Sequence, residues 1–286
     1  MLKTRFITAS VLLACFIPIF LFSSAITFAL IISLVISLAA WEWGRFLWPE
    51  QKYKAIYFSL FTLQLLILIL ILLQQFDGEI LKDVQLCLQV ILWASAIFWI
   101  FYVPFILRKS LQFSIAKNIW LLTIAGLVIF ISDFYALILL REKGILVLLT
   151  VLVIVWVADI GAYFTGKKWG KHKLAPQISP GKSREGAIGG VFLVCMIAFA
   201  FSHYNILTND FFSLIGKNYS VFGLLLISVF LASMSVIGDL FESQLKRLIG
   251  VKDSSKLLPG HGGVLDRLDA LLPVLPIAAL LMMGIS

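Results

Sequence analysis

Long apolar runs separated by short polar connections are the feature that most constrains what this sequence can fold into. Windows of about 20 residues, the length of a helix that crosses a bilayer, identify apolar runs near 6–22, 24–42, 55–73, 86–106, 119–140, 144–163, 187–204, 219–238 and 268–285. Backbone amides inside a bilayer must be satisfied within the protein, so runs of this length predict helices. The sequence therefore predicts an all-α, polytopic integral membrane protein with about nine transmembrane helices.

The composition agrees with this fold class. Apolar residues make up 61% of the 286 positions, and the mean hydropathy is +1.04, which is too apolar for a water-soluble globule. The three cysteines, Cys15, Cys87 and Cys195, all lie in or beside apolar runs and offer neither a disulfide framework nor a paired-cysteine metal site. No repeat, low-complexity tract or soluble domain is visible in the sequence. We therefore expect residues 1–286 to form a single helical membrane domain, with the first run retained as a helix rather than removed as a signal peptide.

Basic residues are distributed unequally between the alternate connections of nine spans. Only Lys82, Arg141, Lys143 and Lys217 fall on one side, and the other 19 of the 23 lysines and arginines fall on the opposite side. Basic connections of membrane proteins stay in the cytoplasm. We therefore expect a cytoplasmic N-terminus. The two longest polar connections, within 159–186 and 238–269, then share the cytoplasmic face and can build one site.

The stretch from Ser243 to Asp269 is the longest polar passage between two apolar runs. It reads SQLKRLIGVKDSSKLLPGHGGVLDRLD, and it combines cations, carboxylates and glycines. Cations and closely approaching backbone N–H groups bind phosphate oxygens, whereas carboxylates bind a divalent ion. This combination predicts a site for a phosphorylated ligand and a metal ion.

Four polar residues share one stripe of the helix in which the eighth run ends: Asp239, Glu242, Ser243 and Lys246, with Arg247 at its edge. A helix end that simply surfaces into water would show the same mixture of charges. The glycine-rich turn at 258–263, followed by Asp266 and Asp269, favours a functional interpretation, because carboxylates from two helix ends can converge on one hard cation. His261 stands without a second His or Cys, so it is not expected to bind metal.

The connection from Gly166 to Gly186 carries six cations among turn-forming residues. Cytoplasmic retention and attraction to anionic lipid would also explain such a cluster. Two fragments approach a nucleotide-binding P-loop, but each lacks a required residue, so neither is taken as one. Within the apolar runs, Asp133 and Glu42 could each mark a cavity or a partner, although Glu42 followed by Arg45 is more simply a pair at a helix end.

These polar stretches resemble the signature regions of the phosphatidate cytidylyltransferases, also called CDP-diacylglycerol synthases. The match comprises Ser243, Leu245-Lys246-Arg247, Lys252-Asp253, Ser255, Leu258-Pro259, His261-Gly262-Gly263 and Asp266-Arg267-Leu268-Asp269. A second stretch of the family is similar to Asp159, Gly161, Tyr163 and the residues that follow as far as Gly186. The resemblance covers the whole chain and is most specific at 159–186 and 238–269.

The resemblance implies that phosphatidate and CTP react to give CDP-diacylglycerol and pyrophosphate, in phospholipid biosynthesis, with Mg²⁺ as the cofactor. One or two divalent ions, a further monovalent ion and a homodimer are compatible with it. The protein would be a multi-pass protein of the bacterial cytoplasmic (inner) membrane, with its active site facing the cytoplasm. Its partners would be CTP, phosphatidate and the lipid bilayer, and nucleic acid is not expected.

The resemblance also implies roles for single residues. Asp239 and Asp266 would be metal ligands, Asp269 and Glu242 would be the next candidates, and Ser243 would assist. Lys246, Arg247, Lys252 and Arg267 would hold the triphosphate and pyrophosphate, and His261 would donate a hydrogen bond rather than act as a base. Lys167, Ser179, Lys182 and Ser183, with Asp159, would complete the headgroup or nucleotide pocket. Which basic cluster takes which substrate stays open.

Two other classes of protein use similar residues. A CTP-dependent lipid or polyprenol kinase would need the same cations and carboxylates, but it would release CDP. A transporter for an anionic lipid would explain basic connections, but it would place polar or broken helices at mid-membrane in both halves of the chain. Here the polar residues concentrate at one face, which favours the nucleotidyltransferase.

Overall fold

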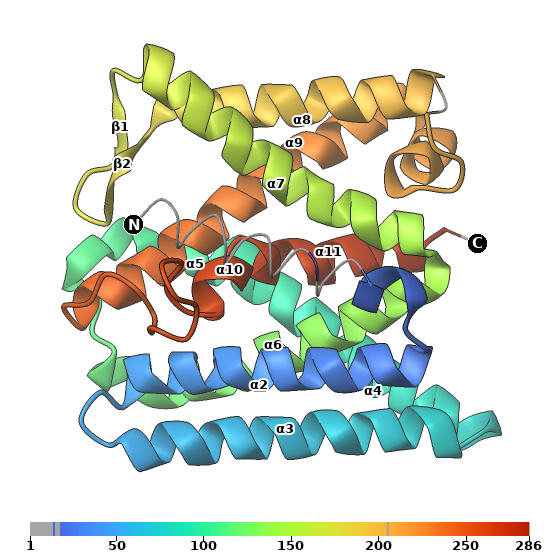
Figure 1. The fold of residues 1–286 in the computed structure, drawn as a ribbon, viewed down its shortest axis with the longest axis horizontal. Helices are drawn as coiled ribbons and strands as arrows, with labels where there is room; N and C mark the ends of the chain where they lie inside the picture. The colour runs from blue at the N-terminus through green and yellow to red at the C-terminus, as the bar shows by residue number, and fades with distance from the viewer. Residues whose placement is uncertain (1–13, 15–17, 205, 286) are drawn as a thin grey trace. The chain divides into compact units, whose positions relative to one another are not determined.

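The computed structural model describes residues 14, 18–204 and 206–285, and Figure 1 shows its fold. The first expected span, 6–22, lies largely outside the described residues and stays a prediction. The described helices are α2 (Ala25–Leu47), α3 (Lys52–Gln75), α4 (Gly78–Ile97), α5 (Val103–Lys109), α6 (Ile119–Lys143), α7 (Ile145–Trp169), α8 (Arg184–Tyr204), α9 (Phe211–Leu248), α10 (Leu265–Leu268) and α11 (Leu271–Met283).

Shorter elements complete the chain between these helices. A π-helical turn, η1 (Phe98–Tyr102), links α4 to α5, and the 3₁₀ turns η2 (Ser110–Gln112) and η3 (Ala116–Asn118) precede α6. The connection after α7 contains β1 (Lys173–Ala175) and β2 (Ser179–Ser183), an antiparallel hairpin in which Lys173 lies opposite Ser183. The helical fold class is confirmed, with this hairpin as the one sheet in the described residues.

Among the described residues, seven helical segments are long and apolar enough to cross a membrane: Ala25–Leu47, Lys52–Gln75, Gly78–Gln112, Ala116–Lys143, Ile145–Trp169, Arg184–Tyr204 and Phe211–Leu248. They correspond to the seven runs expected between 24 and 238. The last expected span, 268–285, forms α11, whose 13 residues rise only about 20 Å, against about 30 Å for the bilayer core. The count of nine therefore stays a prediction.

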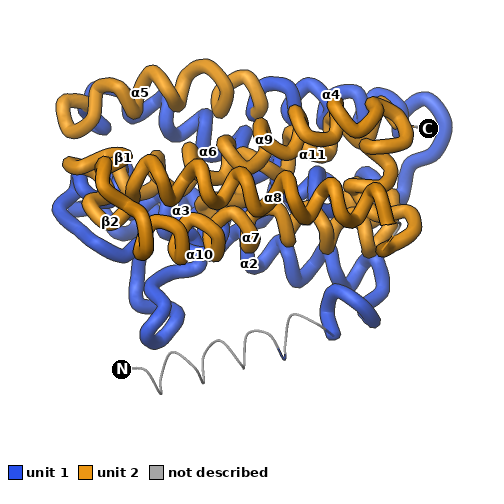
Figure 2. The backbone as a smooth tube through the Cα atoms, turned by 90° about the horizontal axis from the view of Figure 1, so that it is seen from above, with its two compact units in different colours: residues 1–95, 114–138, 245–268 blue, residues 96–113, 139–244, 269–286 orange. Residues whose placement is uncertain are grey.

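The chain forms two compact units, which Figure 2 distinguishes by colour. Unit 1 comprises Met1–Ser95, Ser114–Ile138 and Leu245–Leu268, and unit 2 comprises Ala96–Phe113, Leu139–Gln244 and Asp269–Ser286. The division falls inside α4, α6 and α9, so each of these helices contributes to both units. The expected single domain over 1–286 is not tested by this division and stays a prediction.

In unit 1, α2 is the helix against which the other elements pack. It lies side by side with α3 (Figure 1), and Gly44 permits this approach because a Cβ there would lie 2.8 Å from the Cα of Ala55. The buried indole of Trp43 donates a hydrogen bond to the Leu122 carbonyl of α6 at 3.1 Å, and its ring meets Phe130 edge-on at 6.0 Å. These contacts fix the end of α2 that carries Glu42.

In unit 2, small residues allow α7 and α8 to pack closely. A Cβ at Gly190 would lie 2.4 Å from the Ala158 carbonyl oxygen, and a Cβ at Gly186 would lie 2.8 Å from the Ala162 carbonyl oxygen. Small residues at helix contacts are the usual way in which membrane helices approach one another. Because the hairpin joins these two helices, their close packing also fixes where the hairpin begins and ends.

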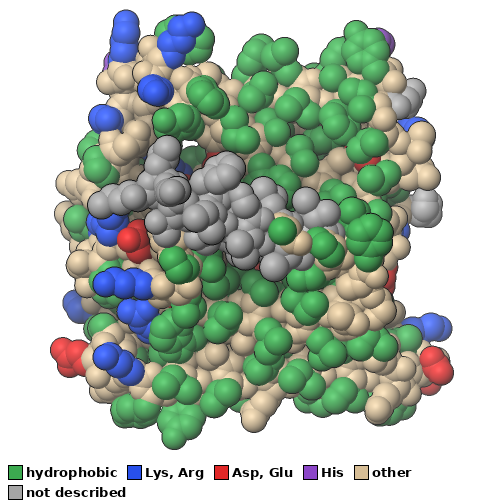
Figure 3. Space-filling model, viewed as in Figure 1, with side chains coloured by type: hydrophobic (Ala, Val, Ile, Leu, Met, Phe, Trp, Pro, Cys, Tyr) green, Lys and Arg blue, Asp and Glu red, His purple; other side chains and the backbone are tan. Residues whose placement is uncertain are grey.

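Large apolar side chains remain exposed on the described helices. Phe101, Trp120, Phe192 and Phe222 are 64–80% exposed, and Figure 3 shows hydrophobic side chains over much of the visible face. A water-soluble protein rarely exposes so much apolar surface. Together with the long apolar helices, this surface identifies an integral membrane protein.

Candidate active site

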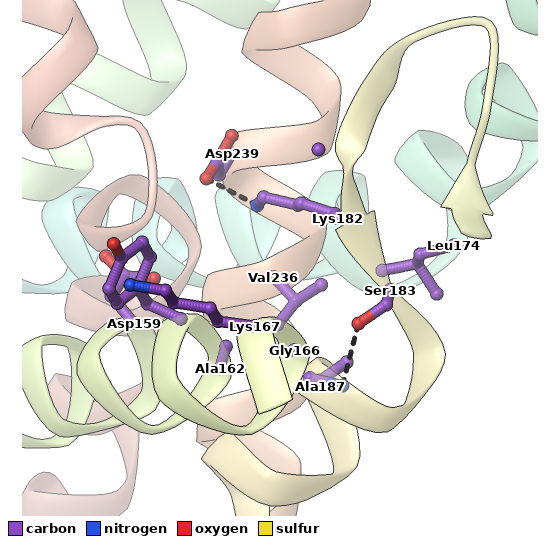
Figure 4. Close-up of a pocket in the computed structure, with 13 residues that line it drawn as sticks. Asp159, Ala162, Gly166, Lys167, Leu174, Lys182, Ser183, Ala187, Val236 and Asp239 are labelled. Carbon is purple, nitrogen blue, oxygen red and sulfur yellow. Dashed lines mark hydrogen bonds and ion pairs between the residues drawn. The ribbon is translucent and has the colours of Figure 1, made fainter. Parts of the chain in front are cut away.

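Unit 2 contains a cavity of about 400 Å³ bounded by α7, the β hairpin, α8 and α9 (Figure 4). We call this cavity the α7–α9 pocket. Its lining residues are Asp159, Ala162, Tyr163, Gly166, Lys167, Leu174, Gly181, Lys182, Ser183, Gly186, Ala187, Val236 and Asp239. One part of the wall is charged and another part is apolar, so the pocket can receive a ligand that has both characters.

An ion pair spans the charged side of the pocket. Lys182 on β2 reaches toward α9, and its ammonium contacts Asp239 Oδ2 (Figure 4). The other oxygen of Asp239 accepts a hydrogen bond from Ser243 Oγ at 3.2 Å, one helical turn further along α9. The Lys182 and Asp239 side chains are 27% and 26% exposed, so both remain accessible to a ligand.

The remaining pocket residues predicted from the sequence have separate contacts. The Lys167 ammonium lies 5.9 Å from the centre of the Tyr163 ring, and Asp159 lines the pocket from α7. Ser183 caps the start of α8, since its Oγ accepts a hydrogen bond from the Gly186 N–H at 3.1 Å. Ser179 pairs with Ala175 in the hairpin and lies outside the set that lines the pocket.

Close backbone packing places Asp269 beside α9. A Cβ at Gly238 would lie 2.2 Å from the Asp269 carbonyl oxygen and 2.8 Å from Cδ of Pro273, so only glycine permits this contact next to Asp239. The Asp269 carboxylate accepts a hydrogen bond from the Ala270 N–H at 2.8 Å. Glu242, also on α9, is only 2% exposed. Both expected carboxylates therefore belong to unit 2, together with Asp239.

Unit 1 contains a second ion pair, between Lys246 and Asp266. The ammonium lies 2.5 Å from Asp266 Oδ1, and the two side chains are 10% and 9% exposed. Asp266 Oδ2 accepts hydrogen bonds from the N–H and Oγ of Ser254, at 2.9 and 2.8 Å, and from the Gly263 N–H at 2.7 Å. Burial raises the pKa of the Asp266 carboxyl, but the hydrogen bonds from Lys246, Gly263 and Ser254 outweigh it and leave the pKa below its ordinary value of 3.8.

The segment 249–264, which we call the signature loop, is shaped by its own turns. Its hairpin-like turn closes with a hydrogen bond from the Leu258 N–H to the Gly262 carbonyl at 2.8 Å. Gly260 and Gly262 have φ of 77° and 85°, backbone conformations that favour glycine. The Arg267 guanidinium holds the same turn, donating to the His261 carbonyl oxygen at 2.7 and 3.3 Å.

Other predicted residues in or beside the signature loop differ in how firmly they are held. Arg247 donates a hydrogen bond to the Val251 carbonyl at 3.0 Å, whereas Lys252 is exposed. The Nδ1 atom of His261 is buried and has no hydrogen-bond partner within the part of the chain that the structure describes. Arg247 therefore stabilises the loop backbone, and Lys252 is accessible to a ligand.

A sequence profile of the cytidylyltransferase family matches residues 3–284 of this chain. The chain belongs to this family. It is 37% identical to the phosphatidate cytidylyltransferase of Pseudomonas aeruginosa over 286 residues, which cover 99% of this chain and 97% of the relative. It is also 37% identical to that of Haemophilus influenzae over 291 residues, covering 96% of each chain. The resemblance read from the two polar stretches is thereby confirmed.

The fold of this cytidylyltransferase-family chain groups the predicted residues into two clusters. The first is the α7–α9 pocket with Ser243, and the second joins Lys246, the signature loop and Asp266. Among the described residues, no three His, Cys, Asp or Glu side chains gather closely enough to hold a metal ion. The proposed ligands Asp239, Glu242, Asp266 and Asp269 therefore stay a prediction.

One residue that contacts the signature loop was not among the site residues predicted from the sequence. Glu42 was interpreted as half of a helix-end pair with Arg45, but its carboxylate accepts hydrogen bonds from Ser254, Val264 and Leu265. Arg45 instead donates to the Ser254 carbonyl at 2.9 Å. The only signal in the sequence was a carboxylate at the end of an apolar run, which does not reveal a partner so far along the chain.

Proposed function

We propose that this chain catalyses the transfer of a cytidylyl group from CTP to phosphatidate, giving CDP-diacylglycerol and pyrophosphate. The observation that carries the proposal is the α7–α9 pocket. Its wall contains both the cations Lys167 and Lys182 and the apolar side chains of Leu174 and Val236. A phosphorylated lipid needs cations for its headgroup and apolar contacts for its chains. The names of the relatives, which cover nearly the whole chain, support the same reaction.

The reaction places modest chemical demands on the protein. An oxygen of the phosphatidate phosphate attacks the α-phosphorus of CTP, the bond from that phosphorus to the bridging oxygen breaks, and pyrophosphate leaves with the electron pair. A phosphomonoester is largely ionised at neutral pH, so it needs neither a covalent enzyme nucleophile nor a strong general base. The work that remains is to position two polyanions and to stabilise the negative charge that develops on the oxygens.

The cations of both clusters suit this work. In the pocket, Lys182 is half of an ion pair that a phosphate oxygen can enter by replacing Asp239 as the partner of the ammonium. In unit 1, Lys246 stands in the same relation to Asp266. Lys252 in the signature loop, with Arg247 and Arg267 beside it, adds further positive charge. We propose that Lys246, Arg247, Lys252 and Arg267 hold the triphosphate of CTP and the departing pyrophosphate, as the resemblance implies.

The donor set also fits Mg²⁺. This ion prefers oxygen ligands and commonly binds through one or two carboxylates together with substrate phosphates. Asp239 and Ser243 Oγ supply neighbouring oxygen atoms on α9, and Asp266, Asp269 and Glu242 are further carboxylates of the two clusters. Bound Mg²⁺ would neutralise charge on the phosphate oxygens during transfer.

We propose that both clusters face the cytoplasm of a bacterial cell. The connection after α7 and the connection after α9 are separated by two crossings, α8 and α9, so they reach the same side if every candidate span crosses the membrane. Most lysines and arginines lie in the connections of that side, which indicates the cytoplasm. CTP is made there, and the lipid substrate can enter sideways from the bilayer.

The destination of a radioactive label tests the proposal. The detergent-purified protein is incubated with phosphatidate, Mg²⁺ and CTP labelled at the α-phosphate, with and without a chelator. We expect label in the lipid, equimolar pyrophosphate, and loss of both when the chelator is present. Label in soluble CDP would instead identify a lipid kinase, and label that stays in CTP would favour a transporter.

A further inference from the structure

Glu42 of α2 is buried beneath the signature loop and is bound by it. The residue is 0% exposed. Its Oε1 accepts hydrogen bonds from Ser255 Oγ and, at 3.1 Å, from the Val264 N–H. Its Oε2 accepts from Ser254 Oγ at 3.0 Å and from the Leu265 N–H at 2.6 Å. One carboxylate thus gathers two hydroxyl and two backbone donors, two at each oxygen.

These donors lie on either side of the glycine-rich turn of the signature loop. Ser254 and Ser255 stand before the glycine-rich turn, whereas Val264 and Leu265 follow it, and Leu265 is the first residue of α10. Glu42 therefore holds the two arms of the turn together. Gly263 shows how tight this arrangement is, because a Cβ there would lie 2.2 Å from Glu42 Oε1 and 2.0 Å from Ser254 Oγ.

Ser254 connects Glu42 to Asp266. Its Oγ lies 3.0 Å from Glu42 Oε2 and 2.8 Å from Asp266 Oδ2, and its N–H donates to the same Asp266 oxygen at 2.9 Å. A hydroxyl group carries a single proton, so it donates to only one of the two carboxylates at a time. The position of each carboxylate is therefore coupled to the other through one side chain. Arg45 steadies this link by donating to the Ser254 carbonyl.

We propose that Glu42 is a positioning residue for cytidylyl transfer, acting through Ser254 and the start of α10 to set the orientation of Asp266. The inference rests on the proposed function for its effect on the reaction, but the contact itself can be tested without activity. Leaving the buried Glu42 carboxylate without hydrogen-bond donors would cost free energy of folding. An uncharged amide in its place has only one acceptor oxygen and cannot satisfy donors at both positions. The carboxylate of Glu42 is therefore specifically required.

Kinetics of Glu42→Gln test the effect on the reaction. The amide places an NH₂ group against the donors at one oxygen, and a shift of about 1 Å in reacting groups can cost about 100-fold in rate. We expect kcat to fall about 10- to 100-fold, and the Mg²⁺ concentration for half-maximal activity to rise several-fold, because Asp266 is a proposed ligand. A purely structural role would reduce the amount of active enzyme and leave that Mg²⁺ concentration unchanged.

A double-mutant cycle tests whether Glu42 acts through the loop hydroxyls. Ser255→Ala removes one donor to Glu42 without altering the carboxylate. If the proposal holds, its effect on kcat shrinks at least several-fold in the Glu42→Gln background, because the contact is already lost. Equal effects in both backgrounds would overturn it. The matched control is Ser37→Ala on the same helix, where the buried hydroxyl donates to the Leu34 carbonyl of its own helix.

Limited proteolysis tests the contact independently of activity. Trypsin cleaves after lysine, and Lys252 and Lys256 are exposed in the signature loop. We expect cleavage there to be at least several-fold faster in Glu42→Gln than in the wild type or Ser37→Ala. If Glu42→Gln cannot be purified folded, Glu42→Asp and Ser255→Ala replace it, with smaller effects in the same direction.

The two readouts separate the two proposals. Faster cleavage in Glu42→Gln together with an inactive wild type would refute the proposed reaction and keep the loop contact. An active wild type together with wild-type kcat, Mg²⁺ dependence and cleavage in Glu42→Gln would refute the positioning role. Faster cleavage with lower kcat and unchanged Mg²⁺ dependence would also refute it, since the loop would then be held without any effect through Asp266.

Discussion

Two lysine–aspartate pairs recur in the two clusters. Lys182 contacts Asp239 in the α7–α9 pocket, and Lys246 contacts Asp266 beside the signature loop. Each pair joins a cation suited to phosphate with a carboxylate suited to a divalent ion. In the proposed reaction, a phosphate group would contact the lysine of a pair and Mg²⁺ would bind its aspartate. The pairs differ in exposure, and Asp266 is the more constrained carboxylate because three donor groups also lie within hydrogen-bonding distance of its Oδ2.

Asp266→Asn should abolish turnover while the protein stays folded in the membrane. The substitution removes the negative charge and places an NH₂ group against either Lys246 or the donors at Oδ2. We expect a loss of about 100-fold or more in kcat/KM, measured by label transfer into lipid. Normal activity in this variant would refute the assignment of Asp266 to the metal site.

Lys182→Ala should lower kcat/KM by about 100-fold, because it removes a preorganised cation from the pocket. Label transfer at several phosphatidate and CTP concentrations measures the change. Lys117→Ala is the matched control, since Lys117 is exposed on the 3₁₀ turn before α6 and lies in neither cluster. An equal loss in both variants would show that the site extends beyond the two clusters.

At the level of elements, the close packing of α7 on α8 determines the pocket. Both helices supply lining residues, and the hairpin between them supplies Lys182. The glycines on α8 bring its backbone against the carbonyls of α7, as Gly190 does at Ala158. Any side chain at such a position would separate the helices and move the two walls of the pocket apart.

Gly190→Ala should therefore destabilise the protein. Its Cβ would lie 2.4 Å from the Ala158 carbonyl oxygen, and overpacking of this kind costs about 1–3 kcal/mol. We expect a lower thermal unfolding midpoint in detergent. Gly181→Ala is the control for stability, because no atom lies within 4 Å of the Cβ it would add. Equal midpoints for Gly190→Ala and the wild type would contradict the packing argument.

At the scale of the whole molecule, the direction in which the chain crosses the membrane decides whether the site meets its substrates. Both substrates of the proposed reaction are accessible from the cytoplasmic face, one from water and one from the inner leaflet. If every candidate span crosses the membrane, the connections after α7 and α9 lie on one side and the connection between α8 and α9 lies on the other. Orientation is thus a functional property, and accessible cysteines can measure it.

Cysteine labelling should report opposite sides for Lys171→Cys and Lys217→Cys, made in a variant without Cys15, Cys87 and Cys195. Both lysines are exposed, Lys171 after α7 and Lys217 early in α9. In intact bacterial spheroplasts, an impermeant maleimide should label Lys217→Cys only, and lysis should expose Lys171→Cys. The reverse pattern would overturn the proposed cytoplasmic site.

Much of this protein was determined by local sequence alone. The length of an apolar run decides whether a helix can cross a bilayer, so seven of the expected spans are found in the described residues. Turn chemistry is also local, and Gly260 and Gly262 adopt the positive φ that glycine favours. The types and spacing of residues at 159–186 and 238–269 were enough to identify the family, which the profile over 3–284 confirms.

The tertiary structure alone decided which distant side chains meet. Lys182 pairs with Asp239 because α9 packs where the hairpin ends, and Glu42 binds the signature loop because Trp43 and Gly44 fix the end of α2. The apolar run expected at 268–285 forms α11 only from Leu271, because a turn at 269–270 follows α10, and 13 helical residues remain. Periodicity within one segment specifies the faces of that segment, but the choice of partner depends on packing between segments, which no local pattern contains.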